Sequence, residues 1–435
     1  MKKLAAGFLP FAIAMLVSQP VAAMTSVTAL LDQAKARTKE EARVPLADAA
    51  APGWKELDAT QRLHGPEAPA YLRALASLPH AVAPFANLVP TFLYRGNLPS
   101  ELKAGLGLRV AQINGSPYVA AHMVRVLQST ERGRAVLTAL RAGELATLTP
   151  ADRLAFEHVE ALTRRVDSLT TADFARIRSA YNDSELVELT LMACFFNHVT
   201  RYAEALRLPV ETWALDGSAP IPSAASPEPA GARIALLADD EITAAAAALE
   251  ASSAQNQAPN SWRIGMANSQ RAMLRVPALA LAWRALGTSV RDKEAVGRDV
   301  KLQVSFAVSV TNGCRYCTLH QVLGLRRIGV EPAKLVSLRK DDSALTPREA
   351  VAVRFARKLT VEPGAMTDAD YAPLRQEFGE AGALEVVLQT CGFAFMNRFT
   401  DGLRLPSEDE AIRVYHEVYN GEWQKERALL KDAKE

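Results

Sequence analysis

The sequence predicts an all-α protein built from two tandem copies of one helical domain. Alanine, leucine and arginine are abundant, whereas the alternating β-branched runs that mark strands are scarce. The chain also repeats itself: residues 108–122 read LRVAQINGSPYVAAH and residues 306–320 read FAVSVTNGCRYCTLH. Asparagine, tyrosine and histidine recur in these two segments 198 positions apart. A repeat of this length implies two copies of one domain.

Two further blocks extend the repeat and supply helix-start signals. Residues 148–150 and 345–347 both read LTP, and residues 206–209 and 403–406 both read LRLP, with an offset of 197. Each LTP block has a Thr cap, a Pro at the first helical position and a carboxylate three residues after the cap, which is typical of a helix start. We therefore expect a helix after each block.

The first 23 residues read as a targeting segment. Lys2 and Lys3 precede an apolar run from Leu4 to Val17, and small residues ending at Ala23 fit a cleavage site. We expect removal of this signal peptide and a periplasmic or secreted protein. A retained membrane anchor is the alternative, but the run is too short to span a bilayer.

The rest of the chain divides by composition and by the repeat. We expect an N-terminal extension (24–64), a first domain without a cysteine pair (65–212), a linker rich in Pro, Ser and Ala (213–235), a second domain with the pair (236–407) and a charged helical tail (408–435).

Charge and cysteine content exclude some functions. The net charge is +2, from 50 basic and 48 acidic residues, so we expect no nucleic-acid partner. No segment after the first 23 residues is long and apolar enough to predict a membrane span. Four cysteines are too few for a disulfide framework, which favours reading two of them as a reactive pair.

The reactive pair lies at a predicted helix break. Asn312-Gly313 ends one helix and places Cys314 in the first turn of the next, and spacings of three put Cys314, Cys317 and His320 on one face. The helix N-terminus favours a thiolate, and a nearby histidine can exchange a proton with it. These are the parts of a thiol redox centre.

Cysteine pairs also occur in haem sites, zinc sites and structural disulfides. A c-type haem site requires a histidine directly after the second cysteine, where Thr318 stands. A zinc site requires more ligands than this segment supplies. We therefore expect no metal and no cofactor, whereas an inert structural disulfide remains an alternative. Cys194 and Cys391 occupy equivalent places in two apolar helices and are expected to be buried, unreactive thiols.

The pattern Asn-Gly-Cys-x-Tyr-Cys followed by His resembles the carboxymuconolactone decarboxylase and AhpD-like alkylhydroperoxidase superfamily. The downstream blocks LTPRE (345–349), FARKLT (355–360), MTDAD (366–370) and NRFTDG (397–402) resemble its peroxidase-related branch. The resemblance covers residues 262–407 well and 65–210 more faintly. It implies two tandem AhpD-like helical domains, of which only the second can perform thiol chemistry.

The resemblance also implies roles for the site residues. Cys317 would attack a peroxide and become a sulfenic acid, and Cys314 would resolve it to a disulfide. The helix terminus alone would favour Cys314 as the more acidic thiol. The family's histidine lies four residues after the second cysteine, where Gln321 stands, and His320 is one residue earlier. The family's relay glutamate corresponds to Leu302, so Asp299 is the candidate replacement.

The expected function is that of a thiol-dependent, alkylhydroperoxidase-type peroxidase. Its partners would be a peroxide substrate and an unidentified thiol or disulfide reductant, with self-association through helical faces left open. One alternative is a thiol–disulfide oxidoreductase without peroxidase activity. Another is a carboxymuconolactone-decarboxylase-like lactone enzyme, which would use histidine and acid groups and need no cysteine. A non-enzymatic binding module is a further alternative.

Overall fold

A computed structural model describes residues 24–49, 54, 56–166, 169–216, 267–291 and 295–419. Within these ranges the protein is all-α and has no β-strand, which confirms the predicted fold class. The expected signal peptide, most of the expected linker and the end of the expected tail lie outside the described residues.

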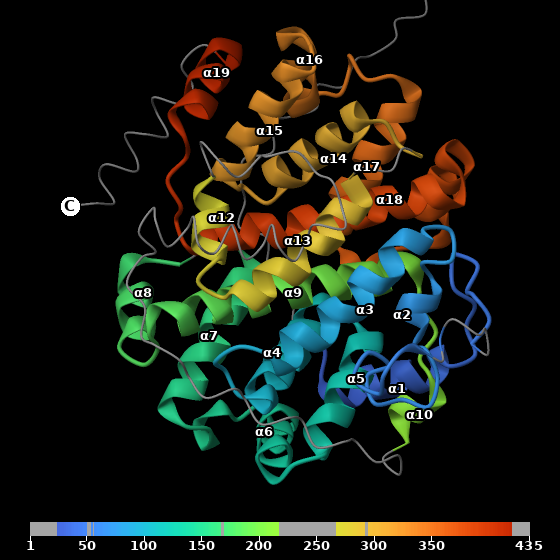
Figure 1. Cartoon of the computed structure of the whole chain (residues 1–435), viewed down its shortest axis with the longest axis vertical. Helices are drawn as coiled ribbons and strands as arrows, with labels where there is room; N and C mark the ends of the chain where they lie inside the picture. Colours follow the sequence, from blue (N-terminus) through green and yellow to red (C-terminus); the bar gives the residue numbers. More distant parts are fainter. Residues whose placement is uncertain are drawn as a thin grey trace, which may run out of the picture.

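The helices follow the same order in the two copies (Figure 1). After the N-terminal helix α1 (Val27–Arg37), the first copy contains α2 (Ala70–Arg73), α3 (Pro79–Tyr94), α4 (Ser100–Asn114), α5 (Pro117–Gln128), α6 (Glu131–Ala142), η2 (Leu145–Thr147), α7 (Pro150–Arg164), α8 (Thr171–Arg178), α9 (Asp183–Leu206) and α10 (Thr212–Leu215). The second contains α12 (Asn268–Met273), α13 (Pro277–Arg291), α14 (Arg298–Thr311), α15 (Arg315–Arg327), α16 (Pro332–Lys340), α17 (Pro347–Val361), η3 (Pro363–Ala365), α18 (Asp368–Gly402) and α19 (Asp409–Tyr419).

The predicted helix starts are confirmed at both LTP blocks. The Thr149 hydroxyl accepts the Asp152 N–H at 3.1 Å, and the Thr346 hydroxyl accepts the Glu349 N–H at 3.3 Å. Each bond satisfies one of the backbone donors that a helix N-terminus leaves without a partner. The same local signal therefore starts α7 and α17.

Helix α18 of the second copy is kinked at the place where the first copy divides into two helices, α8 and α9. Gly379 has φ 68° and ψ −178° inside α18, a conformation that only glycine adopts readily. Its counterpart in the repeat is Asn182, the N-cap residue of α9. The chain therefore turns at the same place in both copies.

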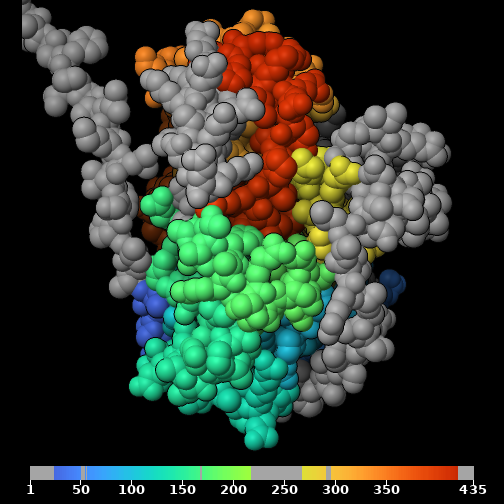
Figure 2. Space-filling model, turned by 90° about the vertical axis from the view of Figure 1, so that its left-hand side faces the viewer, coloured from blue at the N-terminus to red at the C-terminus, as the bar shows by residue number. Residues whose placement is uncertain are grey.

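The two copies pack face to face, with α9 against α18 and α3 against α13 (Figure 1). In the space-filling view, the green residues of the first copy meet the red ones of the second along a broad contact (Figure 2). One hydrophobic cluster runs through both copies: Phe92 stacks on Phe195 at 4.6 Å and meets Phe395 edge-on at 6.1 Å. The copies therefore form one body rather than two separate domains.

Buried arginines cross this contact in a reciprocal way. Arg201 Nη2 donates to the Thr360 carbonyl at 2.9 Å, and Arg398 Nη2 donates to the Thr163 carbonyl at 3.1 Å. Both pairs are related by the 197-residue offset. The contact between the copies is therefore close to two-fold symmetric, like that of a homodimer.

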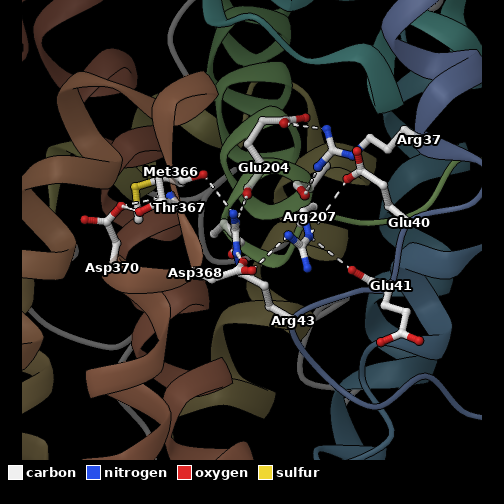
Figure 3. Close-up of polar contacts among 12 residues, drawn as sticks. Arg37, Glu40, Glu41, Arg43, Glu204, Arg207, Met366, Thr367, Asp368 and Asp370 are labelled. Carbon is white, nitrogen blue, oxygen red and sulfur yellow. Dashed lines mark hydrogen bonds and ion pairs between the residues drawn. The ribbon is translucent and has the colours of Figure 1, made fainter.

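The N-terminal extension ties the copies together through Arg43 (Figure 3). Its Nη1 donates to the carbonyls of Glu204 and Ala205 in the first copy at 2.8 and 3.0 Å. Its Nη2 reaches the Met366 carbonyl, and its Nε reaches Asp368 Oδ1, both at 2.8 Å and both in the second copy. Arg43 is thus a four-bond link between the halves.

In the described part of the chain, no helix combines the length and hydropathy needed to span a bilayer.

Candidate active site

The cysteine pair lies where α14 ends and α15 begins. Gly313 has φ 71°, which reverses the chain after α14, and Cys314 is the N-cap residue of α15. The Cys314 sulfur accepts the Cys317 N–H at 3.4 Å. Both cysteines are buried, with 1% and 4% of their surface exposed. The predicted helix break and the first-turn position of Cys314 are confirmed.

Both sulfur atoms contact one side chain of α18. Thr400 Oγ1 lies 3.3 Å from Cys314 Sγ and 3.4 Å from Cys317 Sγ. The two cysteines are free thiols in this structure. The fold therefore gathers the two thiols around one hydroxyl, on the same side of α15.

The electrostatic environment of Cys314 favours the neutral thiol. Burial raises its pKa well above the ordinary value, and the hydrogen bond with Cys317 and the negative charge of Asp401 raise it further. This outweighs the helix N-terminus, which by itself would make Cys314 the more acidic thiol. In the resting protein, Cys314 is therefore protonated.

His320 is held one turn after Cys317 by two oxygen acceptors. Its Nδ1 lies 2.8 Å from the Tyr316 carbonyl oxygen, and its Nε2 lies 2.6 Å from Glu408 Oε2. The Tyr316 ring stacks on the imidazole with the ring centroids 4.2 Å apart. The imidazole is therefore held between a backbone carbonyl oxygen and a carboxylate oxygen.

Glu408 completes the cluster as its carboxylate. Burial alone would raise its pKa, but hydrogen bonds from His320 and from the Asn268 N–H outweigh burial and lower it to about 2. The Tyr316 hydroxyl donates to Glu408 Oε1 at 3.0 Å, and the Asn268 N–H donates to the same oxygen at 2.7 Å. Glu408 is therefore an anion at neutral pH, and it pairs with His320.

Sequence reasoning missed Glu408, although the repeat contains a signal for it. Glu211 and Glu408 each follow an LRLP block by two residues and differ by 197 positions. Glu408 is also the first residue of the range that we read as a charged tail. In the structure, that range continues into α19, which packs on α15 and α16.

The structure does not bring Asp299 to the thiols. Asp299 is exposed in the first turn of α14, whereas Cys314 follows the last turn of that helix. A helix of this length spans about 20 Å, at 1.5 Å per residue. Among the described contacts, Asp299 makes no hydrogen bond or ion pair with the thiols or with His320, and its role as the replacement for the relay glutamate stays a prediction. Glu408, from the other end of the domain, supplies a carboxylate to His320 instead.

The first copy keeps the acid–base cluster but not the thiols. Tyr118 OH and His122 Nε2 contact the two oxygens of Glu211 at 3.1 and 2.9 Å, matching Tyr316, His320 and Glu408. The hydroxyl of Ser116, at the place of Cys314, donates to Glu204 Oε1 at 2.7 Å. Val119 stands at the place of Cys317.

A small cavity of about 40 Å³ adjoins this cluster in the first copy. Val119, His122 and Ala203 are among its mostly apolar lining residues. Ala203 is the counterpart of Thr400. The first copy therefore has an apolar space where the second copy has its thiols and their hydroxyl.

Among the described residues, no group of three His, Cys, Asp or Glu side chains has the geometry of a metal site.

One comparison with known proteins matches part of the second copy. Residues 277–358 match the model of the carboxymuconolactone decarboxylase family. No curated protein matches the sequence significantly. Among solved structures, the debrominase Bmp8, in a crystal structure with 2,3,4-tribromopyrrole, is similar with a TM-score of 0.36 and 16% identity. That match covers 43% of this chain and 98% of the other.

Proposed function

We propose, from the match of residues 277–358 to the carboxymuconolactone decarboxylase family, that the second copy is a thiol-dependent peroxidase of the alkylhydroperoxidase type. One observation carries the proposal. Two free thiols contact a single hydroxyl one helical turn from the His320–Glu408 pair. A thiol peroxidase needs an attacking thiolate, a second thiol to resolve it and a proton donor.

In the first step, the Cys317 thiolate attacks one oxygen of a hydroperoxide. The O–O bond breaks, the sulfur becomes a sulfenic acid, and the other oxygen leaves as an alcohol after taking a proton. His320, which lies beside Glu408, is the proposed donor for that proton. Cys314 fits the second role because burial keeps it protonated until the sulfenic acid has formed.

In the second step, Cys314 loses its proton and its thiolate attacks the Cys317 sulfur. The S–OH bond breaks, and the hydroxide leaves as water after taking a proton, so a Cys314–Cys317 disulfide remains. An external dithiol then supplies two electrons and two protons and restores both thiols. No cofactor takes part. The physiological setting that we propose is outside the cytoplasm, following the N-terminal targeting segment.

The first copy acts as a structural partner in this proposal. It contributes α9 to the contact that positions α18, which carries Thr400. It has Ser116 and Val119 in place of the two cysteines, so it cannot perform the same redox cycle. The symmetric contact between the copies replaces the subunit contact that a single-domain protein would need.

The test counts thiols before and after one equivalent of an alkyl hydroperoxide. All four cysteines are free in the structure, so the wild-type protein should go from four titratable thiols to two under denaturing conditions. The Cys317→Ser protein should lose none. Cys391→Ala is the matched control, because Cys391 is fully buried at the equivalent of Cys194, and it should still lose two. Unchanged thiol counts in the wild type would contradict the proposal.

One observation favours a second candidate, an acid–base enzyme of the decarboxylase-like kind. The Tyr–His–Glu cluster is present in both copies, including the copy without thiols. Such an enzyme would retain activity on a carboxylated lactone when Cys314 and Cys317 are both replaced by alanine. Release of carbon dioxide by that double variant would support the second candidate over the first.

A further inference from the structure

Thr400 has one hydroxyl proton and four oxygen or sulfur atoms within reach. Its Oγ1 lies 3.0 Å from the Met396 carbonyl oxygen, one turn earlier in α18, 3.4 Å from the Asn397 carbonyl oxygen, and within 3.4 Å of both sulfurs. A hydroxyl donates one hydrogen bond and accepts two. When both cysteines are protonated, the Thr400 hydroxyl donates to the Met396 carbonyl oxygen, and Thr400 Oγ1 accepts hydrogen bonds from the two thiols.

Loss of a thiol proton changes this arrangement. A thiolate has no hydrogen to donate. The Thr400 hydroxyl can therefore rotate away from the Met396 carbonyl oxygen and donate its hydrogen bond to the charged sulfur. Hydrogen bonds to charged groups are roughly twice as strong as neutral ones, which offsets the loss of the bond to Met396. Because both sulfurs are within reach, the same rotation serves either thiolate.

The duplication contains an internal comparison for this role. The first copy lacks both thiols and has Ala203 at the position of Thr400. A second threonine of α18, Thr390, makes the same bond to the carbonyl one turn earlier, at 2.8 Å from Val386 O. Thr390 is buried, but its hydroxyl makes no hydrogen bond with Cys314 or Cys317. The copy that has the two cysteines therefore has the Thr400 hydroxyl beside them, and the copy without the cysteines has alanine at that position.

The charges around the pair increase the need for a donor. Asp401, next to Thr400 on α18, disfavours the Cys314 thiolate through its negative charge. Cys194 of α9 interacts electrostatically with Cys317 and with Arg398 of α18. His320 lies one turn after Cys317 on α15, and Glu408 pairs with it. The Thr400 hydroxyl is the side-chain group that touches both sulfurs among these neighbours.

We propose that Thr400 is the positioning residue of the thiol site. It donates to the Cys317 thiolate while that sulfur attacks the peroxide, and then to the Cys314 thiolate while that sulfur attacks the sulfenic acid. This inference rests on the proposed peroxidase cycle, but its test measures thiolate formation and needs no peroxide.

The experiment titrates each thiol by its thiolate absorbance in the ultraviolet. It uses the full-length Cys314→Ser and Cys317→Ser proteins, each with and without Thr400→Val. Removing the Thr400 hydroxyl should raise the titration midpoint of the cysteine that remains, Cys314 or Cys317, by about one pH unit. This corresponds to a tenfold lower thiolate fraction at neutral pH. Thr400→Ser should restore the original midpoint in both proteins.

Thr390→Val is the matched control, because it removes an equivalent buried hydroxyl from the same helix. It should leave both midpoints unchanged. Thr400→Ala is the second variant if Thr400→Val does not fold, since alanine occupies this position in the first copy. Titration curves that superpose with and without the Thr400 hydroxyl, in either protein that keeps one cysteine of the pair, would overturn the inference.

Peroxide consumption by the wild-type protein is measured separately. A shifted midpoint in a protein that consumes no peroxide would end the proposed function and leave the role of Thr400 as a thiolate donor intact. Normal peroxide consumption with no shift would end the role of Thr400 and leave the proposed function intact.

Discussion

Arg201 reaches from α9 across the boundary between the copies to the Thr360 carbonyl oxygen, 2.9 Å away. Its guanidinium is also held by Asn197 Oδ1 at 2.7 Å, and only 2% of the residue is exposed. Because Arg398 makes the mirrored contact, each copy supplies one buried arginine to the other. The stability of either half therefore depends on both.

Replacing Arg201 by methionine should destabilise the whole chain. The change removes the donor to the Thr360 carbonyl and leaves Asn197 Oδ1 with the Asn114 amide as its donor, which should lower the free energy of unfolding by about 3 kcal/mol. Arg398→Met should have a similar effect. Urea unfolding followed by circular dichroism measures both.

Arg178→Met is the control for these arginines. Arg178 is exposed and pairs with Asp183 at the surface, so its loss should change stability by less than about 1 kcal/mol. Equal effects of Arg178→Met and Arg201→Met would show that the contact between the copies contributes little.

Replacing Cys314 by serine should stop the proposed cycle after one oxidation. The Cys317 sulfenic acid would form but find no resolving thiol, because a serine hydroxyl does not attack it at neutral pH. A sulfenic-acid reagent followed by mass spectrometry should label Cys317 in this variant and not in the wild type. Continued turnover by the Cys314→Ser protein would show that another thiol resolves the intermediate.

Replacing Glu408 by glutamine should lower peroxide turnover by about 10²-fold or more. The amide carries no negative charge to pair with His320, and proton donation by a positioned group is worth ~10²–10⁴-fold. Glu211→Gln changes the matching residue of the first copy, and Asp299→Asn changes an exposed carboxylate. Both should retain wild-type rates. A loss of turnover with Glu211→Gln instead would place the active site in the first copy.

Glu349 should make stability depend on pH in the acid range. Burial alone would raise its pKa, but hydrogen bonds from Gln303, Lys334 and the Thr346 N–H lower it from 4.5 to about 2. Because the folded pKa lies below the unfolded one, the stabilisation is complete above about pH 4.5 and is lost as the pH falls towards 2.

Thermal unfolding at intervals from pH 6 to pH 2.5 tests this. The melting temperature of the wild-type protein should fall more steeply below pH 4.5 than that of Glu349→Gln, which has no carboxyl to protonate. Parallel curves for the two proteins would show that Glu349 does not contribute to acid sensitivity.

The sequence predicted the helical fold and the break before Cys314 because both depend on local signals. Caps such as Thr149 and Thr346, and the Asn312-Gly313 turn, act within a few residues of where they stand. Glu408 and Thr400 could not be placed in the same way. They lie more than 80 residues after the cysteines, and only the packing of α18 and the chain after it brings them to α15.

The candidate Asp299 shows the same limit of local signals. Helical spacing correctly put Asp299 on α14, but a helix face does not say which end of the helix the site occupies. The repeat offered a better guide, since Glu211 and Glu408 share a register after the LRLP blocks. Comparing equivalent positions in the two copies therefore identifies site residues better than the sequence of either copy alone.

The mirrored contact between the halves has an evolutionary consequence. In a homodimer of identical subunits, every substitution appears in both active sites at once, so neither site can lose its nucleophile while the other keeps it. Joining the two copies in one chain removes that constraint. Ser116 and Val119 could replace reactive residues in one half, while selection on Cys314 and Cys317 continued in the other, and α9 and α18 kept the ancestral symmetry of their packing.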